Sequence, residues 1–400
     1  MKLLATTTLL AFFTTEAFRP DAFRPTFDRR LATAVRSTVS AGPSVLESVT
    51  SFGIVEPLAQ AAAAAVRSVE IPVPSSVSPS LSVDITYIKW DAPTAGRGAP
   101  RPPPVLLVHG FDSSCLEYRR LGPELAARSG ADVYAVDLLG WGFTTLDASV
   151  NYSAASKLTA LRGFWDAVDG RPVVLAGASL GGASAILFGA ESERVLGTVL
   201  IDAQGFVDGV GPMASLPGPL AFAGVSVLKS VPLRNAANKM SYADPDTFAT
   251  EDALRVGRVH CVREGWDAAM VSFMKSGGFA PSAAVEKLAD RPVLILWGRQ
   301  DGILDGTEFV PKFEAALGAG SDVEVVWVED SGHVPHLEQP ETTADIIAEF
   351  LTSDKFLTSK EAAGAAQGES NNFPTLAVGV SAVAAAGLAA TLVGGGIGGF

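Results

Sequence analysis

One serine near the middle of the chain lies where a nucleophile is expected. Residues 177–181 read GASLG, directly after the apolar run 173–176 and before a helix-forming stretch. A sharp turn between a strand and a helix exposes the serine hydroxyl, and only small residues fit on either side of it. We therefore predict that Ser179 is a nucleophile that attacks a carbonyl carbon.

His333 is the predicted base, because a serine hydroxyl is a poor nucleophile until a base removes its proton. It lies five residues after the last predicted strand, in a loop that contains glycine. In sites of this type the histidine comes last in the chain. His336, three residues later, is the alternative base, but its place beside Glu338 and the next helix favours a structural hydrogen bond.

Asp301 is the predicted third member, a carboxylate that fixes the tautomer of the histidine and stabilises the imidazolium that forms. It follows the apolar run 293–297, which gives the chain order serine, aspartate, histidine. Two other carboxylates are alternatives for this role. Asp202 ends the preceding predicted strand, and Asp305 lies four residues after Asp301.

Two backbone N–H groups are predicted to stabilise the oxyanion that acyl transfer produces. Leu180, directly after the nucleophile, supplies one of them. Phe111 is expected to supply the other, from the loop that follows the apolar run 105–108. His109 precedes a tight glycine turn in that loop and is predicted to brace it rather than to react.

A largely parallel sheet is predicted to position these residues. Between about Ser80 and Leu351, short β-branched runs alternate with amphipathic helical stretches, which indicates an α/β fold with helices on both faces of the sheet. The direction of the first strands stays open. The predicted strands are 83–90, 105–108, 133–136, 173–176, 195–201, 293–297 and 323–328, and the predicted helices are 116–128, 156–165, 182–189, 308–317 and 342–351.

An inserted cap is predicted over residues 203–290. Roughly 85 residues separate two successive strands there, whereas a single crossing helix needs about a dozen. Helices are expected at 250–260 and 265–275. Their apolar side chains either face a pocket or pack the cap onto the core.

The composition excludes several classes of function. A formal net charge of −13 argues against binding to a nucleic-acid backbone, which requires clustered Lys and Arg. Cys115 and Cys261 are the two cysteines, too few for a disulfide scaffold, and the four histidines show no metal-binding spacing. We therefore expect no nucleic-acid partner, no metal and no other cofactor.

The N-terminus predicts two targeting segments. Residues 1–17 combine a lysine, a short apolar run and small residues around a cleavage position after Ala17, the pattern of a signal peptide. Residues 18–45 begin with Phe18 and contain several Arg, Ser and Thr residues. Together they resemble the bipartite leaders of algae with secondary plastids, which predicts a plastid protein. A secreted protein is the alternative.

The C-terminal residues 375–400 are uncharged and rich in Ala and Gly, and 375–393 match a membrane-spanning helix in length. Because Ala and Gly contribute little transfer free energy, this segment is predicted to be either a membrane anchor or a low-complexity tail. In a secreted product it would instead resemble a lipid-anchor signal. Residues 352–374 are the predicted linker to it.

The residues named above resemble those of the α/β-hydrolase superfamily, in particular its single-cap members. The likeness covers about 80–351 and rests on His109-Gly110-Phe111, on residues 137–144 (DLLGWGFT), on the Ser179 turn, on 297–301 (WGRQD) and on Gly332-His333. Residues 106–142 are most similar to plastid members of plants and algae. The resemblance implies an eight-stranded sheet with the cap inserted after strand 6.

The same resemblance narrows the expected chemistry. Epoxide hydrolases and dehalogenases of the superfamily carry aspartate at the turn where this chain has Ser179, and Tyr242 is the one tyrosine of the cap. The leading expectation is a carboxylesterase or lipase that cleaves an ester or thioester of a small apolar acyl substrate through an acyl-serine. The alternatives are a C–C bond hydrolase that uses the same three residues and a non-catalytic scaffold that binds a partner. The acyl length and the oligomeric state stay open.

Overall fold

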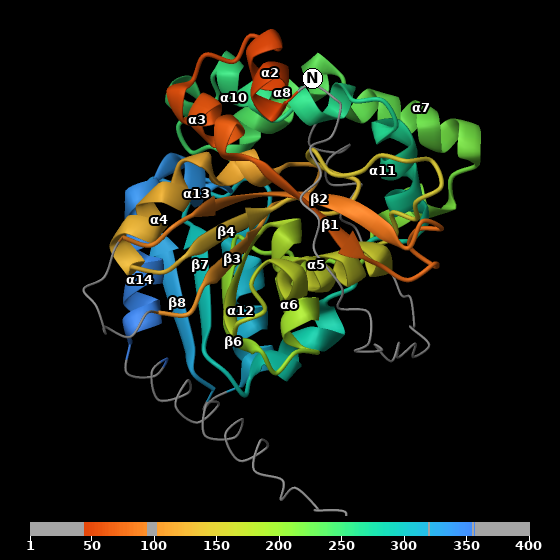
Figure 1. The fold of residues 1–400 in the computed structure, drawn as a ribbon. Helices are drawn as coiled ribbons and strands as arrows, with labels where there is room; N and C mark the ends of the chain where they lie inside the picture. The colour runs from red at the N-terminus through yellow and green to blue at the C-terminus, as the bar shows by residue number, and fades with distance from the viewer. Residues whose placement is uncertain (1–43, 94–101, 319–320, 354–355, 357–400) are drawn as a thin grey trace, which may run out of the picture. The chain divides into compact units, whose positions relative to one another are not determined.

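A computed structural model describes residues 44–93, 102–318, 321–353 and 356. Its centre is an eight-stranded sheet with the strand order β1-β2-β4-β3-β5-β6-β7-β8 (Figure 1). The pairs from β4 to β8 are parallel, and β1 and β2 run antiparallel to their neighbours. The mostly parallel eight-stranded sheet is therefore confirmed. Its strands are β1 (Arg67–Pro72), β2 (Ser82–Trp90), β3 (Val105–Val108), β4 (Val133–Val136), β5 (Val173–Ala178), β6 (Val195–Ile201), β7 (Val293–Gly298) and β8 (Val323–Val328).

Strand β1 precedes the predicted start of the fold at Ser80. It pairs with β2 from Arg67 opposite Tyr87 to Pro72 opposite Ser82. Only Val69 and Ile71 of this edge strand are buried, whereas β3 to β7 are buried along their whole length. An edge strand with one buried face has a weaker apolar signal than a central strand, because its other side chains face solvent.

Helices cover both faces of the sheet. On one face α4 (Leu121–Ser129) packs against α14 (Pro340–Thr352). On the other, α5 (Ala154–Val168) contacts α6 (Leu180–Gly189), and the 3-10 helix η5 (Ser282–Leu288) packs against both α6 and α12 (Gly306–Leu317). The predicted helix 116–128 is two pieces, η2 (Cys115–Arg119) followed by α4.

The cap lies between β6 and β7, as predicted, and forms the upper part of Figure 1. The predicted helix 250–260 is interrupted, because α10 ends at Val256, with Gly257 as its C-cap, and a 3-10 turn follows. Two further helices, α7 and α8, lie in the first half of the cap, for which the sequence predicted no helix. The elements are η3 (Gly211–Ser215), α7 (Gly218–Leu228), α8 (Val231–Ser241), α9 (Pro245–Phe248), α10 (Glu251–Val256), η4 (Val259–Val262) and α11 (Trp266–Lys275).

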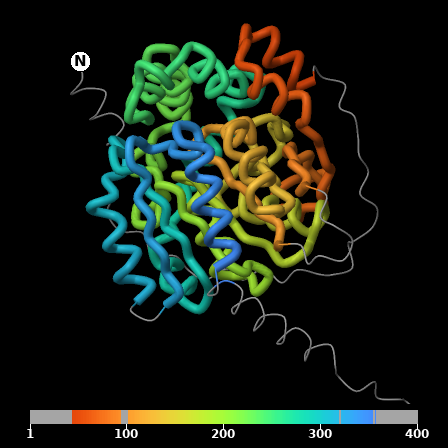
Figure 2. Tube along the Cα trace, turned by 90° about the vertical axis from the view of Figure 1, so that its left-hand side faces the viewer, coloured from red at the N-terminus to blue at the C-terminus, as the bar shows by residue number. Residues whose placement is uncertain are grey.

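Two short helices before the sheet, α2 (Val45–Ser51) and α3 (Pro57–Ala65), lie beside the cap in both Figure 1 and Figure 2. Ser44 and Glu47 form a capping box that starts α2. Asp252 of the cap accepts hydrogen bonds from the N–H groups of Val55 (3.0 Å) and Glu56 (2.6 Å). Because Glu56 also pairs with Arg119 of η2 at 2.9 Å, this segment joins the cap to the core.

Most of the predicted terminal segments lie outside the described residues. These are the signal peptide 1–17, residues 18–43 of the transit segment, most of the linker and the tail 375–400. Within the described part, no helix has the length and apolar character needed to cross a membrane. Phe356, in the predicted linker, is fully buried and packs against Phe350 of α14, with ring centroids 5.5 Å apart.

Candidate active site

Ser179 occupies the turn between β5 and α6 in a backbone conformation that is rare for residues with a side chain. Its φ is 51° and its ψ is −121°, a combination that costs on the order of 1–3 kcal/mol. The Ser179 N–H donates to Ile201 O at 2.9 Å, and its carbonyl accepts from Gly182 (2.9 Å) and Gln204 (2.8 Å). Hydrogen bonds from β6 and from α6 thus hold the turn in this conformation.

Glycine is required on both sides of the serine, because the backbones come too close for a side chain. A Cβ on Gly181 would lie 1.9 Å from Val108 O, and one on Gly177 would lie 2.3 Å from Gly181 O. Both distances are far inside van der Waals contact with backbone atoms, which cannot move aside. The sequence GASLG therefore matches the geometry of the turn in its small residues as well as in its serine.

The predicted base and carboxylate are in direct contact. His333 Nδ1 lies 2.8 Å from Asp301 Oδ2, and both side chains are buried. Asp301 Oδ1 also accepts the N–H groups of Ile303 (2.7 Å) and Leu304 (3.0 Å). Burial by itself would raise the pKa of Asp301, but the charge and hydrogen bond of His333 and these two N–H donors lower it overall.

The loops after β7 and β8 meet because both contain glycine at the contact. A Cβ on Gly298 would lie 1.9 Å from Gly332 O. The Gly332 N–H donates to Glu338 Oε2 at 2.7 Å, and the His333 N–H donates to Ser241 O of α8 at 2.8 Å. The histidine loop is therefore held from one side by α13 (Pro335–Glu338) and from the other by the cap.

The other carboxylates and histidine that the sequence left open have separate surroundings. Asp305 is the N-cap of α12 and accepts the Thr307 N–H at 2.9 Å. His336 is fully buried, with Nε2 3.1 Å from Glu117 Oε1. Glu117 in turn accepts the Gly110 N–H at 3.2 Å. His336 thus lies against Glu117, which in turn holds the loop that carries Phe111.

Asp202 lies next to Asp301 in the structure, because β6 and β7 are neighbouring parallel strands that end at the same edge. It is fully buried, and its Oδ1 accepts the Gly298 N–H at 2.9 Å. Burial, and after it the charge of Asp301, raises the pKa of Asp202 well above its usual value. Among the hydrogen bonds of the described residues, His333 contacts Asp301 and not Asp202, so the structure brings together the predicted pair.

Both predicted oxyanion donors are free to bind a ligand. Among the hydrogen bonds of the described residues, neither the Phe111 N–H nor the Leu180 N–H has an acceptor. Both residues line the same cavity as Ser179 and His333. His109 braces the loop as expected, since its Nδ1 lies 2.8 Å from Gly110 O and its Nε2 accepts the Leu138 N–H at 3.0 Å.

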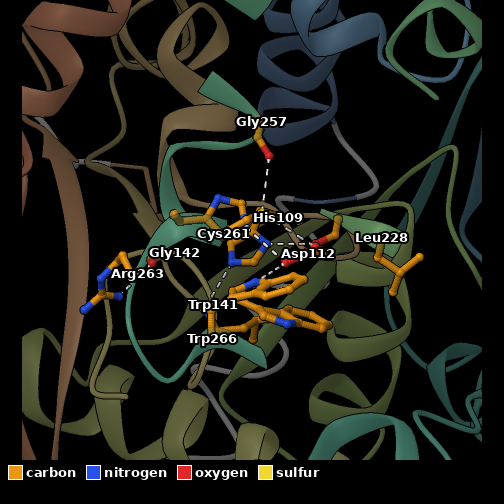
Figure 3. A network of polar contacts seen from close by, with 12 residues as sticks. His109, Asp112, Trp141, Gly142, Leu228, Gly257, Cys261, Arg263 and Trp266 are labelled. Carbon is orange, nitrogen blue, oxygen red and sulfur yellow. Dashed lines mark hydrogen bonds and ion pairs between the residues drawn. The ribbon is translucent and has the colours of Figure 1, made fainter. Parts of the chain in front are cut away.

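A buried polar network fixes the Phe111 loop to the cap (Figure 3). Asp112 has a φ of 48° and a fully buried carboxylate. Its Oδ1 accepts Trp266 Nε1–H at 2.9 Å and lies 3.1 Å from His260 Nε2, while its Oδ2 pairs with Arg234. All three partners belong to the cap. The sequence did not predict this network, since the partners lie 122 to 154 residues away from Asp112.

Two clusters in the described residues contain atoms of the kind that bind metals. In each of the groups Asp112, His260, Cys261 and Asp202, Asp301, His333 the possible donor atoms lie within 4.8 Å of one another. In the first group, Arg234 Nη2 contacts both the Asp112 carboxylate and Cys261 Sγ, the latter at 3.2 Å, so its positive charge would repel a bound cation. The fold thus brings together residues whose sequence spacing gave no metal signal.

A cavity of about 290 Å³ connects the serine, the histidine and the two N–H donors. Its walls are mainly apolar, and they include Leu228 and Leu233 of the cap. Ala253 and Val256 also line it, whereas the apolar residues of α11 (Met270, Phe273 and Met274) are buried in the core instead. The charged side chains of the lining have partners: Asp112 with Arg234, Glu117 with His336 and Arg119 with Glu56.

The amino-acid sequence matches a family model and is similar to known proteins. Residues 105–346 match the model of the alpha/beta hydrolase family. Alpha/beta hydrolase domain-containing protein VTE7 of Arabidopsis thaliana is 37% identical over 250 residues, which cover 62% of this chain and 74% of that protein. Lipase 1 of Psychrobacter immobilis is 25% identical, over 60% of this chain and 74% of its own.

A further relative and a solved structure extend the comparison. The 2-hydroxy-6-oxononadienedioate/2-hydroxy-6-oxononatrienedioate hydrolase of Paraburkholderia xenovorans is 27% identical, over 64% of this chain and 88% of its own. A thermophilic esterase from Thermogutta terrifontis superposes with a TM-score of 0.57 at 20% identity, over 71% of this chain and 98% of that one. The structural likeness establishes the fold, and the relatives include ester and C–C bond hydrolases.

Proposed function

Because this chain belongs to the alpha/beta hydrolase family, we propose that it is a serine hydrolase that cleaves an ester or thioester through an acyl intermediate on Ser179. The observation that carries the proposal is the single cavity shared by Ser179, His333 and the N–H groups of Phe111 and Leu180. Behind it, Asp301 holds His333 at 2.8 Å. A nucleophile, a base with an oriented tautomer and two oxyanion donors are the groups that acyl transfer requires.

The proposed reaction has two halves. His333 Nε2 takes the proton of the Ser179 hydroxyl as its oxygen attacks the acyl carbon, and the N–H groups of Phe111 and Leu180 hold the oxyanion. The imidazolium gives this proton to the leaving alcohol or thiol as the carbon–oxygen or carbon–sulfur bond breaks. A water, deprotonated by His333, then attacks the acyl carbon, and the imidazolium returns this proton to Ser179 Oγ as the acyl–serine bond breaks and the acid leaves. Asp301 keeps its negative charge throughout and stabilises the imidazolium.

The contact between Ser179 and His333 has to tighten for this reaction. Among the described hydrogen bonds none joins Ser179 Oγ to His333 Nε2, although both side chains line the cavity. Such contacts are often long until substrate fills the site. The serine lies at the N-terminus of α6, where the helix dipole favours developing negative charge.

We infer that the substrate is an uncharged ester with an apolar acyl group. The cavity walls are mainly apolar, and the charged groups among them are paired within the protein, so no unpaired charge attracts an ionic substrate. An apolar group gains about 25 cal/mol for each Å² that it buries against such walls. The fit of a C–C bond hydrolase substrate, which carries carboxylate groups in the case of the Paraburkholderia relative, is therefore poorer.

Labelling with a fluorophosphonate probe tests the enzyme proposal against a non-catalytic scaffold. We expect the folded full chain to form an adduct at Ser179, and Ser179→Ala to form none. Mass spectrometry of the labelled peptide gives the site. A folded wild-type protein that stays unlabelled would favour the scaffold that binds a partner.

A substrate panel tests the reaction class. p-Nitrophenyl esters of rising acyl length and a vinylogous 1,5-diketone of the kind cleaved by C–C hydrolases are compared on wild type and Ser179→Ala. We expect serine-dependent ester cleavage with a preferred acyl length, because side chains of the cap line the cavity. Equal rates for all lengths would contradict the apolar acyl site, and turnover of the diketone alone would assign the enzyme to C–C cleavage.

We also propose a plastid location, with residues 1–45 as the leader and 375–400 as a membrane anchor. The leader composition and the plant origin of one relative support the location. Fluorescent fusions of residues 1–45, and of the full chain with and without residues 375–400, test both parts. Export of the leader fusion would favour secretion, and extraction of the full chain by carbonate would contradict the anchor.

A further inference from the structure

A second buried carboxylate, Asp202, lies against the acid of the proposed triad. Its φ is 44°, so the backbone holds it in an unusual conformation at the end of β6. Its Oδ1 accepts one N–H, that of Gly298, and its Oδ2 is buried with no hydrogen-bond partner of the described residues. One carboxylate oxygen of Asp202, one of Asp301 and one ring nitrogen of His333 all lie within 4.8 Å of one another.

Two carboxyl groups this close and this deeply buried do not both ionise at neutral pH, because like charges repel strongly where water is excluded. The surroundings decide which one keeps its proton. Asp301 accepts from His333 Nδ1 and from the N–H groups of Ile303 and Leu304, whereas Asp202 accepts from Gly298 alone. Donors stabilise the charged form, so Asp301 is the better anion.

The negative charge of Glu338 also favours the protonated form of Asp202. Glu338 of α13 adds negative charge, and it is already held by the N–H groups of Gly332 and Asp244. His333, on the loop after β8, faces Asp301 rather than Asp202. Burial first, and then the charge of Asp301, raises the pKa of Asp202 well above its usual value. A proton on Asp202 Oδ2 would also give this otherwise unpartnered oxygen a hydrogen bond to make.

We propose that Asp202 is a positioning residue for the triad: at neutral pH it stays protonated and donates a hydrogen bond through Oδ2 to the carboxylate of Asp301. The pair then carries one negative charge, and Asp301 is held from both sides. This inference rests on the proposed serine hydrolase function, and it assigns to Asp202 neither the role of triad acid nor contact with substrate.

The hydrogen bond from Asp202 limits how strongly Asp301 stabilises the imidazolium of His333. Without that donor, the negative charge of Asp301 is less satisfied and attracts the imidazolium more strongly. The imidazole then keeps its proton to higher pH, where it cannot act as a base. Loss of the donor should therefore move the acidic limb of the pH–rate profile to higher pH.

Two variants of Asp202 separate this role from packing. In Asp202→Asn the amide reproduces a protonated carboxyl, since its oxygen can accept from Gly298 and its NH₂ can donate to Asp301. In Asp202→Ala both contacts are lost. Asp301→Asn is the reference for loss of the triad acid, and Asp305→Asn, at the exposed N-cap of α12, is the matched control.

The rate of fluorophosphonate labelling and kcat/KM are measured from pH 5 to 9. We expect the labelling rate and kcat/KM of Asp202→Asn to stay within about threefold of wild type. For Asp301→Asn we expect kcat/KM to fall by a factor on the order of 10⁴. Asp202→Ala should move the midpoint of the acidic limb upward by about half a pH unit or more. If Asp202→Asn loses as much as Asp301→Asn, Asp202 is the ionised acid and the inference is wrong. An unmoved midpoint in Asp202→Ala also contradicts it.

An infrared difference spectrum keeps this test independent of catalysis. At neutral pH the wild type minus Asp202→Asn should show the carbonyl band of a protonated carboxylic acid, and its absence would overturn the inference. If wild type shows the band but no labelling of Ser179, the proposed function fails while the protonated Asp202 stands.

Discussion

Replacement of Asp112 by alanine is the sharpest test of how the cap supports the Phe111 loop. Alanine leaves the guanidinium of Arg234, which is 17% exposed, without its carboxylate, and it leaves the buried indole N–H of Trp266 without an acceptor. Removing one partner of a buried ion pair costs about 3–5 kcal/mol. Leaving the indole N–H of Trp266 without its acceptor costs about 1–3 kcal/mol, and this cost is part of the same loss rather than an addition to it. We therefore expect the free energy of unfolding to fall by about 3–5 kcal/mol.

Urea unfolding followed by circular dichroism measures this loss, with Asp305→Ala as the control. The carboxylate of Asp305 also accepts a backbone hydrogen bond, from the N–H of Thr307. Because it is an exposed N-cap, we expect Asp305→Ala to lower the free energy of unfolding by only about 1 kcal/mol. The double variant Asp112→Ala/Arg234→Met removes the uncompensated charge as well. The double variant should recover about 1 kcal/mol or more of the free energy of unfolding that Asp112→Ala loses. If Asp112→Ala costs no more than Asp305→Ala, the network does not anchor the loop.

Catalysis by the same variant distinguishes anchoring from mere stability. Because Asp112 adjoins the Phe111 N–H, a displaced loop should lower kcat by up to about 10²–10³, the value of one oxyanion donor. The assay is run far below the unfolding midpoint of the variant. Full kcat in a destabilised Asp112→Ala would refute the link between the network and the proposed oxyanion donor Phe111.

Three further outcomes follow from the site. Gly181→Ala should abolish fluorophosphonate labelling and destabilise the fold, since its Cβ would meet Val108 O at 1.9 Å, whereas Gly218→Ala has open space and should keep both labelling and stability. Ser179→Gly should remove activity yet raise the free energy of unfolding by about 1 kcal/mol or more, because glycine relieves the strain at φ 51°. A fall in the thermal unfolding midpoint, measured by calorimetry, would contradict this. Because the folded pKa of Asp202 is raised, its contribution to stability is full below its unfolded pKa of about 4 and is lost as pH rises through the folded value. Asp202→Asn should therefore gain stability relative to wild type in urea melts as pH rises from about 4, and a constant difference across pH would argue against a shifted pKa.

Much of the proposed site could be predicted from local sequence. The turn at Ser179 is specified by its neighbours, because a buried strand, small flanking residues and a helix all lie within a few residues of it. Asp301 and His333 follow strands whose apolar runs are visible in the sequence, and the order of the strands places both at one sheet edge. The cap was predicted by length alone, since no single crossing helix fills residues 203–290.

Other features were missed because their signals are not local. Edge strand β1 buries only alternate residues. Helices α7 and α8 each carry a proline in the first turn, where it is well tolerated, although proline inside a segment usually argues against a helix. The network around Asp112 joins residues 122 to 154 positions apart. No periodicity within one segment carries such information.

The sequence by itself predicted the proposed nucleophile, base and carboxylate, because each follows a strand in a short stretch whose residue types leave few conformations. Only the tertiary structure decided what surrounds them. It placed Asp202, which follows β6, beside Asp301, which follows β7, and it lined the cavity with a cap fixed through Asp112. The physical reason is that the protonation of a carboxyl group depends on its burial and on the charges beside it, and both arise only when distant segments pack together.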